Sequence, residues 1–150
     1  MINHAQRERL FAQLEQHGKR ITPQRATVIE ALLAHGGHPT PMEVRDLVWQ
    51  KDASISQATV YNTITILAEL DLIRKLNIAD DEHTHYDVDV SPHVNVVCNR
   101  CGRINDVHTD TLEALLGLVA TRSGYQIESG GVTMYGLCDA CQRALRASHE

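Results

Sequence analysis

Aromatic side chains and long apolar runs are scarce in this sequence. Its 150 residues include one Phe, one Trp and four Tyr, so aliphatic side chains must supply most of any core. No apolar run approaches the roughly 18 residues of a membrane-spanning helix. The first residues, MINHAQRERLF, also lack the apolar stretch of a secretory signal. We therefore expect a cytoplasmic protein with no membrane partner.

An excess of positive charge is also missing. The formal net charge is −5, which argues against a protein coated all over with a nucleic-acid-binding surface. The two halves differ, however: residues 1–80 carry nine basic and nine acidic residues, whereas residues 81–150 carry five and ten. A neutral first half can still present one basic face to phosphate, while an acidic second half suits cations.

Patterns of enzyme chemistry are absent as well. The sequence offers no paired nucleophile and base, no acid–base pair and no phosphate loop, so we expect no enzyme. A zinc deaminase is excluded more firmly, because its signature has glutamate two residues after a histidine and no histidine here is followed in that way.

The first half of the chain predicts short helices followed by a hairpin. Helices are expected over residues 2–17, 23–34, 41–50 and 57–70, with Thr22-Pro23, Thr40-Pro41 and Ser56 as start signals. Strands are expected over 72–78 and 85–90, joined by a charged turn. This order is typical of a winged helix-turn-helix DNA-binding domain. A small helical core with a hairpin and no DNA is the alternative.

The second half predicts a separate α/β unit. Strands are expected over 93–98, 103–107, 125–129 and 132–138, with a helix over 109–122 and a helical tail over 139–150. The fold class is therefore α+β: a winged-helix domain over 1–84, a linker over 85–92 and a small dimerisation domain over 93–150. A unit of this size often needs a metal or a dimer partner for stability.

Four cysteines form two Cys-x-x-Cys pairs, Cys98 with Cys101 and Cys138 with Cys141. Two such pairs place four thiolates around Zn²⁺ in a tetrahedron, and the metal would then join the two ends of the second domain. A redox pair is less favoured, since both pairs are equivalent. Iron in the same tetrahedron, as in a rubredoxin-like electron carrier, is chemically possible. An electron carrier would not, however, explain the function of the helical first half.

Histidines and acids gather in one further segment. Seven potential donors fall within 26 residues: His83, His85, Asp87, His93, Asn95, Asp106 and His108. Strand alternation places His85 with Asp87, and His93 with Asn95, on common strand faces. Mixed imidazole and carboxylate donors suit Fe²⁺, Mn²⁺ or Zn²⁺, which predicts a second metal site. The alternative is a polar strand face beside the hairpin.

Taken together, these segments resemble the ferric uptake regulator family of bacterial metal-dependent repressors over nearly the whole chain. The matching segments are RITPQR at 20–25, HPTPMEV at 38–44, SQATVYNTITILAEL at 56–70, PHVNVVCNRCGRINDV at 92–107 and MYGLCDAC at 134–141. The resemblance implies a homodimer whose structural zinc is held by the four cysteines. It also implies a regulatory metal between the domains, with ligands carried over to His38, Asp87, His93, Asn95 and Asp106.

Asn95 is a departure from that family, which usually has histidine there. Asp87 and Asp106 resemble the peroxide-sensing branch, whose set is three histidines and two aspartates. An amide oxygen is a weaker donor than imidazole toward Fe²⁺ or Zn²⁺, which tilts the choice toward Mn²⁺. His85 or His83 could substitute as a ligand. If the metal is Fe²⁺, the resemblance implies that peroxide oxidises His38 or His93 and releases the DNA.

The helix after Ser56 is the expected recognition helix. Its apolar stripe faces the core, which leaves Gln57, Thr59, Tyr61 and Asn62 for the major groove. Tyr61 could instead be a half-buried packing residue, and Asn62 replaces the arginine usual in the family. Cationic side chains near the second helix are expected to reach phosphates: Lys19, Arg20 and Arg25.

These features predict a metal-responsive dimeric transcriptional repressor that binds double-stranded operator DNA. Fe²⁺ or Mn²⁺ would be the regulatory cation, in iron or manganese homeostasis or in a peroxide response, with Zn²⁺ as the structural ion. A zinc-uptake-type regulator and a zinc-stabilised DNA-binding module without metal sensing are the alternatives.

Overall fold

The computed structural model describes residues 3–128 and 131–149, and the chain forms two compact units, Met1–Val90 and Ser91–Glu150. The α+β class predicted from the sequence is confirmed. The division falls inside the segment expected to be a linker, 85–92. Part of that segment is regular structure, because strand β2 covers Thr84–Asp87.

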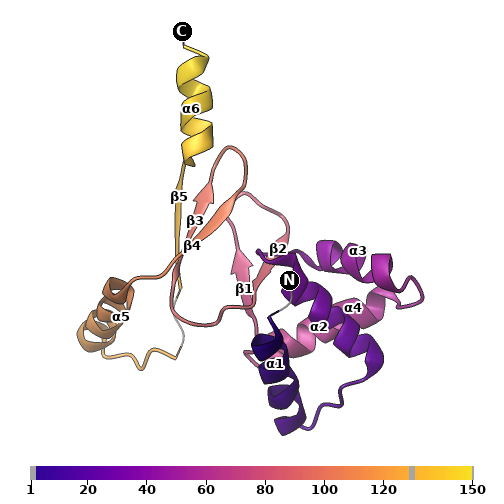
Figure 1. Cartoon of the computed structure of the whole chain (residues 1–150). Coiled ribbons are helices and arrows are strands. Elements are labelled where there is room, and N and C mark those ends of the chain that lie inside the picture. Colours follow the sequence, from indigo (N-terminus) through magenta and orange to yellow (C-terminus); the bar gives the residue numbers. More distant parts are fainter. Residues whose placement is uncertain (1–2, 129–130, 150) are drawn as a thin grey trace. The chain divides into compact units, whose positions relative to one another are not determined.

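The first unit contains four helices (Figure 1): α1 (His4–Gln16), α2 (Pro23–His35), α3 (Pro41–Lys51) and α4 (Gln57–Glu69). Side-chain caps explain all four starts, and Asn3 caps α1 by accepting from the N–H groups of Ala5 and Gln6. Thr22 and Ser56 each accept a hydrogen bond from the backbone N–H three residues on, and Thr40 forms a reciprocal capping box with Glu43. The helix boundaries therefore follow local chemistry that the sequence displays.

A two-stranded wing completes the first unit. Strands β1 (Arg74–Asn77) and β2 (Thr84–Asp87) are antiparallel, with Arg74 opposite Asp87 and Leu76 opposite His85. The register places His85 and Asp87 on one face of β2, while Tyr86 turns to the core. Helices α2, α3 and α4 followed by this hairpin form the winged helix-turn-helix arrangement.

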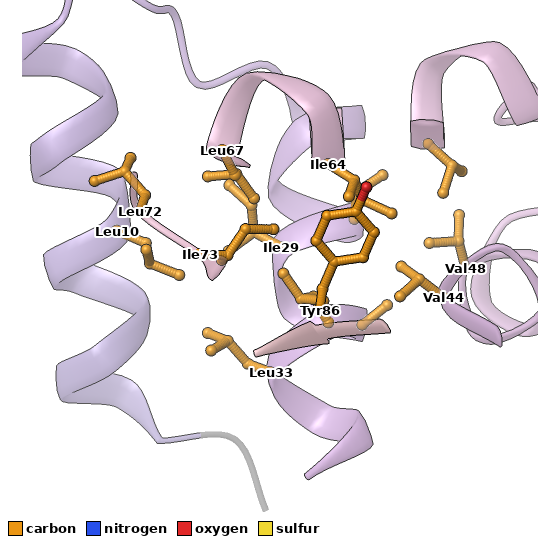
Figure 2. Close-up of a cluster of buried hydrophobic side chains, with 14 of the residues drawn as sticks. Leu10, Ile29, Leu33, Val44, Val48, Ile64, Leu67, Leu72, Ile73 and Tyr86 are labelled. Carbon is orange, nitrogen blue, oxygen red and sulfur yellow. The ribbon is translucent and has the colours of Figure 1, made fainter. Parts of the chain in front are cut away.

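The core of this unit is aliphatic, as the scarcity of aromatics requires. Figure 2 shows Leu10 of α1, Ile29 of α2, Val48 of α3 and Ile64 of α4 in one cluster with Tyr86 of β2. Burial of such side chains contributes about 1.5–3 kcal/mol each. The core therefore fixes α4 and the wing against the other helices.

The second unit is a three-stranded sheet with two helices. Its elements are β3 (Val94–Cys98), β4 (Ile104–Val107), α5 (Asp110–Ser123), β5 (Val132–Gly136) and α6 (Asp139–Ala147). The strand order is β4-β3-β5, with β4 antiparallel and β5 parallel to β3. The strand expected over 125–129 is wrong for 125–128, where Tyr125 is exposed and no strand forms; residue 129 lies outside the described residues.

Much of the second unit's apolar surface remains exposed. On α5 only Leu112 is buried, while Leu115, Leu118 and Val119 are each more than two-fifths exposed. Met134 and Tyr135 of β5 are also exposed. Exposed apolar residues so close in sequence are a typical mark of an interaction surface.

No helix within residues 3–128 and 131–149 has the length and apolar character needed to cross a membrane.

Candidate metal centres and DNA-binding surface

Four thiols from two separated segments meet in the second unit. One donor atom from each of Cys98, Cys101, Cys138 and Cys141 lies within 4.8 Å of the others, and all four thiols are free. Gly102, with φ +74°, closes the turn after β3 by donating its N–H to the Cys98 carbonyl at 3.0 Å. The other pair lies at the start of α6, where Cys138 is the N-cap.

Hydrogen bonds give this cluster thiolate character. The backbone N–H of Cys138 donates to Cys98 Sγ at 3.4 Å, and with the N–H groups of Cys101 and Arg100 it lowers the pKa of Cys98 to about 6. The side-chain hydrogen bond with Cys138 and the desolvation of the thiol raise the pKa of Cys141 to about 12. Because a dication would stabilise the thiolate form of all four side chains, the cluster is suited to binding a metal.

The first unit contributes a buried histidine–aspartate pair. His38 Nε2 lies 3.4 Å from Asp87 Oδ2, and both side chains are buried. Two hydrogen bonds fix β2 to the residues before α3: Tyr86 N–H donates to the Pro39 carbonyl at 2.9 Å, and His85 Nδ1 donates to the His38 carbonyl at 2.7 Å. The wing thus positions His38 beside Asp87.

Asp81, at the tip of the wing, contacts both histidines that were predicted as substitute ligands, His83 and His85. Its carboxylate accepts from the N–H of His83 at 2.8 Å and lies 2.8 Å from His85 Nε2. These bonds lower the pKa of Asp81 to about 2, the His83 N–H being the largest cause. Since both ring nitrogens of His85 are engaged, the geometry disfavours His85 as a ligand, and His83 is exposed on the same turn.

Three polar side chains of the second unit lie on one face of its sheet. Asn95 of β3 lies directly opposite Asp106 of β4, and His93 precedes the same strand in alternation with Asn95. His93 Nε2 is 3.6 Å from Asp106 Oδ1, and His93 Nδ1 donates to the Ser91 carbonyl at 2.8 Å. The His108 ring lies beside that of His93, with ring centroids 5.1 Å apart.

Asn95 has an unusual environment within this group. Its side chain is buried, with 7% of the residue exposed, and its Oδ1 has no hydrogen-bond partner among the residues that the structure describes. A buried carbonyl oxygen without a partner costs about 1–3 kcal/mol. A cation at this face would satisfy it, so the amide fits a ligand position despite replacing histidine.

A cationic groove lies between the starts of α2 and α4. Its volume is about 890 Å³, and among the described residues that line it three are basic and none is acidic: Lys19, Arg20 and Arg25. The N-caps Thr22 and Ser56 also line it, so two helix N-termini open toward the groove and add positive potential. Arg25 is folded back, donating from Nη1 to the Arg20 carbonyl at 2.9 Å.

The predicted DNA-contacting residues of α4 divide between this groove and its surroundings. Thr59 and Asn62 line the groove, whereas Gln57 and Tyr61 do not. Tyr61 is half-buried and packs against the core cluster. Arg45 of α3 donates to the Gln57 side chain and was not among the predicted residues, because no local signal links residues twelve positions apart in different helices.

Comparison with known proteins agrees with this architecture. Residues 16–135 match the ferric uptake regulator family. The peroxide operon regulator of Bacillus subtilis is 32% identical over 130 residues, covering 87% of this chain and 89% of that protein. The peroxide-responsive repressor PerR of Staphylococcus epidermidis is 28% identical, covering 90% and 89%.

Solved structures give the same result. The Campylobacter jejuni peroxide stress regulator has a TM-score of 0.72 and 30% identity, covering 85% of this chain and 96% of that one. The Helicobacter pylori ferric uptake regulator, whose structure reveals three functional metal-binding sites, has a TM-score of 0.73, 24% identity and 93% coverage of both chains, which supports the fold.

A winged-helix unit joined to a unit with a four-thiol metal-ligand set defines a metal-binding transcription regulator. Since the family match spans well over half of the sequence, the chain belongs to the ferric uptake regulator family. Members of this family are transcription regulators and not enzymes, as the sequence predicted.

Proposed function

We propose that this metal-responsive repressor binds operator DNA as a homodimer when Fe²⁺ or Mn²⁺ links its two units, and that it takes part in a peroxide response. The observation that carries the proposal is that each unit holds a prearranged group of imidazole and carboxylate donors, His38 with Asp87 in one and His93 with Asp106 in the other. A ligand set split between two units is the arrangement by which a cation can control their geometry.

The structural ion of the second unit would be Zn²⁺, held by Cys98, Cys101, Cys138 and Cys141. Support comes from the donor chemistry, because four thiols of which at least one is strongly acidified suit a soft tetrahedral cation. The ion would tie the end of β3 to the start of α6. Its binding would therefore contribute directly to the stability of this small unit.

The regulatory cation would take His38, Asp87, His93, Asn95 and Asp106. When bound, it supplies a Lewis-acidic centre that attracts the donors of both units. Nitrogen and carboxylate donors suit Fe²⁺ and Mn²⁺, and the amide oxygen of Asn95 shifts the set toward the harder Mn²⁺. The Ser91 carbonyl accepts from Nδ1 of His93, which leaves Nε2 as the nitrogen aimed at a cation.

DNA would lie on the first unit along α4 and the cationic groove. Helix-turn-helix proteins read base edges with the first residues of the second helix, which here are Gln57, Thr59, Tyr61 and Asn62. Lys19, Arg20 and Arg25, with the N-termini of α2 and α4, provide a place for a backbone phosphate. The half-buried position of Tyr61 is compatible with both packing and base contact.

The exposed apolar residues of α5 and β5 support the homodimer. A second copy of the chain would cover Leu115, Leu118, Val119, Met134 and Tyr135. Two recognition helices on one DNA face must then stand about one helical turn apart, roughly 34–36 Å. Joining the units through shared ligands would fix that spacing, and operator DNA would reciprocally tighten the cation.

The test is binding of the zinc-containing protein to DNA from its own promoter region, with no added metal and with Mn²⁺, Fe²⁺ or extra Zn²⁺. We expect Mn²⁺ or Fe²⁺ to be required and His93→Ala to abolish the metal effect. His17→Ala, on an exposed helix end, is the matched control and should behave as the wild type. Hydrogen peroxide added to the Fe²⁺ complex should release the DNA, and added to the Mn²⁺ complex should not.

Equal DNA binding with and without added metal would overturn metal control while leaving DNA recognition intact. A requirement for Zn²⁺ alone would contradict the proposed cation. Fe²⁺-dependent binding that is insensitive to peroxide would contradict the peroxide response and nothing else.

A further inference from the structure

Arg45 of α3 holds the first residue of the recognition helix in one orientation. Its Nη1 donates to Gln57 Oε1 at 2.9 Å. Two other nitrogens of the guanidinium, Nε and Nη2, donate to Asp46 Oδ1 at 3.0 and 2.8 Å. The same group stacks over the Trp49 ring, 4.8 Å from its centroid.

Trp49 makes this support rigid. Its indole Nε1 donates to the Ile55 carbonyl at 2.8 Å, which ties α3 to the turn just before α4. Arg45 therefore has three separate restraints: a carboxylate, an aromatic face and the amide of Gln57. A guanidinium held in this way is a fixed feature of the protein surface and not a free phosphate-binding cation.

The contact settles which end of the Gln57 amide faces outward. Arginine has only donors, so it must meet the amide oxygen of Gln57, and the NH₂ group is left for other partners. An unrestrained glutamine reads adenine with both groups, the oxygen accepting from N6 and the NH₂ donating to N7. With its oxygen directed to α3, Gln57 presents donors alone.

We propose that Arg45 makes Gln57 a reader of keto bases, selecting guanine or thymine over adenine at one position in each half-site. Guanine presents two adjacent acceptors, N7 and O6, and thymine presents O4, whereas adenine presents N7 beside an N6 amino group that repels an NH₂ donor. The inference rests on the proposed function, in which α4 enters the major groove. Gln57 is exposed and is the first residue of α4, where recognition helices contact bases.

The experiment selects bound duplexes from a randomised promoter-derived library with the metal-loaded protein, followed by affinity measurements on single-base variants. The wild type should prefer a keto base over adenine at one position by roughly fivefold, the size of one net hydrogen bond. Gln57→Ala should lose the preference at that position alone. Arg45→Met, which keeps an apolar stem over Trp49, should free the amide oxygen and move the preference to adenine.

Lys51→Met is the matched control, because it removes one cation from the same helix without touching Gln57. It should weaken all duplexes alike and leave the base preference unchanged. Trp49 fluorescence verifies that each variant is folded.

Two results would overturn the inference while DNA binding persists: identical selected sequences for the wild type and Gln57→Ala, or an unchanged keto preference in Arg45→Met. Absence of DNA binding by the wild type under every metal condition would instead overturn the proposed function.

Discussion

At the scale of single residues, Asn95 is notable because its polar side chain is buried. Its buried Oδ1 lies without a hydrogen-bond partner among the described residues, opposite Asp106 across two strands. Burying an amide oxygen without a hydrogen-bond partner is unfavourable, and a bound cation would supply the missing partner. We therefore expect Asn95 to influence which metal binds at the proposed site.

We expect Asn95→Ala to lower Mn²⁺ affinity at least about tenfold, because a donor is lost from a buried set. Asn95→His should raise affinity for Fe²⁺ and Zn²⁺ relative to Mn²⁺, since imidazole is the softer donor. Calorimetric titration of zinc-containing protein measures both. Val96→Ala, on the opposite face of β3, is the control. Unchanged Mn²⁺ affinity in Asn95→Ala would exclude Asn95 as a ligand.

The Asp81 carboxylate predicts a pH effect at the same scale. Its pKa is lowered from 3.8 to about 2 by its bonds to His83 and His85, so the charged form is favoured by folding. The stabilisation is complete above pH about 4 and is lost as pH falls through about 2. The difference in free energy of unfolding between wild type and Asp81→Asn should therefore shrink between pH 4 and 2.

Fluorescence of Trp49, the only tryptophan, follows this difference in the first unit. The informative range is pH 2 to 4, where the Asp81 carboxylate takes up its proton. If the difference in free energy of unfolding stays constant over this range, protonation of Asp81 is not linked to folding.

At the scale of elements, local capping sets where the helices of the first unit begin. The Thr40 hydroxyl accepts from Glu43 N–H at 3.2 Å, and the Glu43 carboxylate accepts from Thr40 N–H at 3.3 Å. Thr40→Ala should cost about 1 kcal/mol of unfolding free energy. Urea denaturation followed by Trp49 fluorescence measures it. Thr27→Ala, inside α2, should show no comparable loss because alanine is the better helix former.

The four-thiol set links elements in the second unit. Cys138→Ser should release the proposed zinc ion and abolish cooperative unfolding of this unit, because β3 and α6 would lose their common anchor. Metal analysis and thermal circular dichroism measure both effects, while Trp49 fluorescence should remain native. Arg146→Ala, exposed on the same helix, should change neither quantity. Retention of zinc in Cys138→Ser would contradict the proposed ligand set.

At the scale of the whole molecule, the apolar face of α5 predicts the assembly state. Leu118→Glu should convert the proposed dimer to a monomer, because burying an unpaired carboxylate costs several kcal/mol. Sedimentation velocity measures the change, and unchanged zinc content verifies the fold. Glu113→Gln, on the opposite side of α5, should remain dimeric. A dimer of undiminished stability in Leu118→Glu would place the interface elsewhere.

Prediction from sequence succeeded where the signal was local. The Thr-Pro pairs at 22–23 and 40–41 specify helix N-termini, because the threonine hydroxyl caps the helix and the proline ring suits its first position. The observed helices begin there. The strand expected over 125–128 failed for the opposite reason. Its alternating residues have the right composition, but a strand also needs a hydrogen-bonded neighbour, which no local pattern reveals.

Local patterns in the sequence were enough to identify the family, the helices of the first unit and the two Cys-x-x-Cys pairs, because caps, helical periodicity and ligand spacing act over a few residues. Tertiary structure decided the rest: that the thiols of both pairs meet, that Asn95 faces Asp106 with its oxygen buried, and that Arg45 turns the amide of Gln57. Each of these is a contact between distant segments, fixed by strand register and helix packing, and so appears only once the chain has folded.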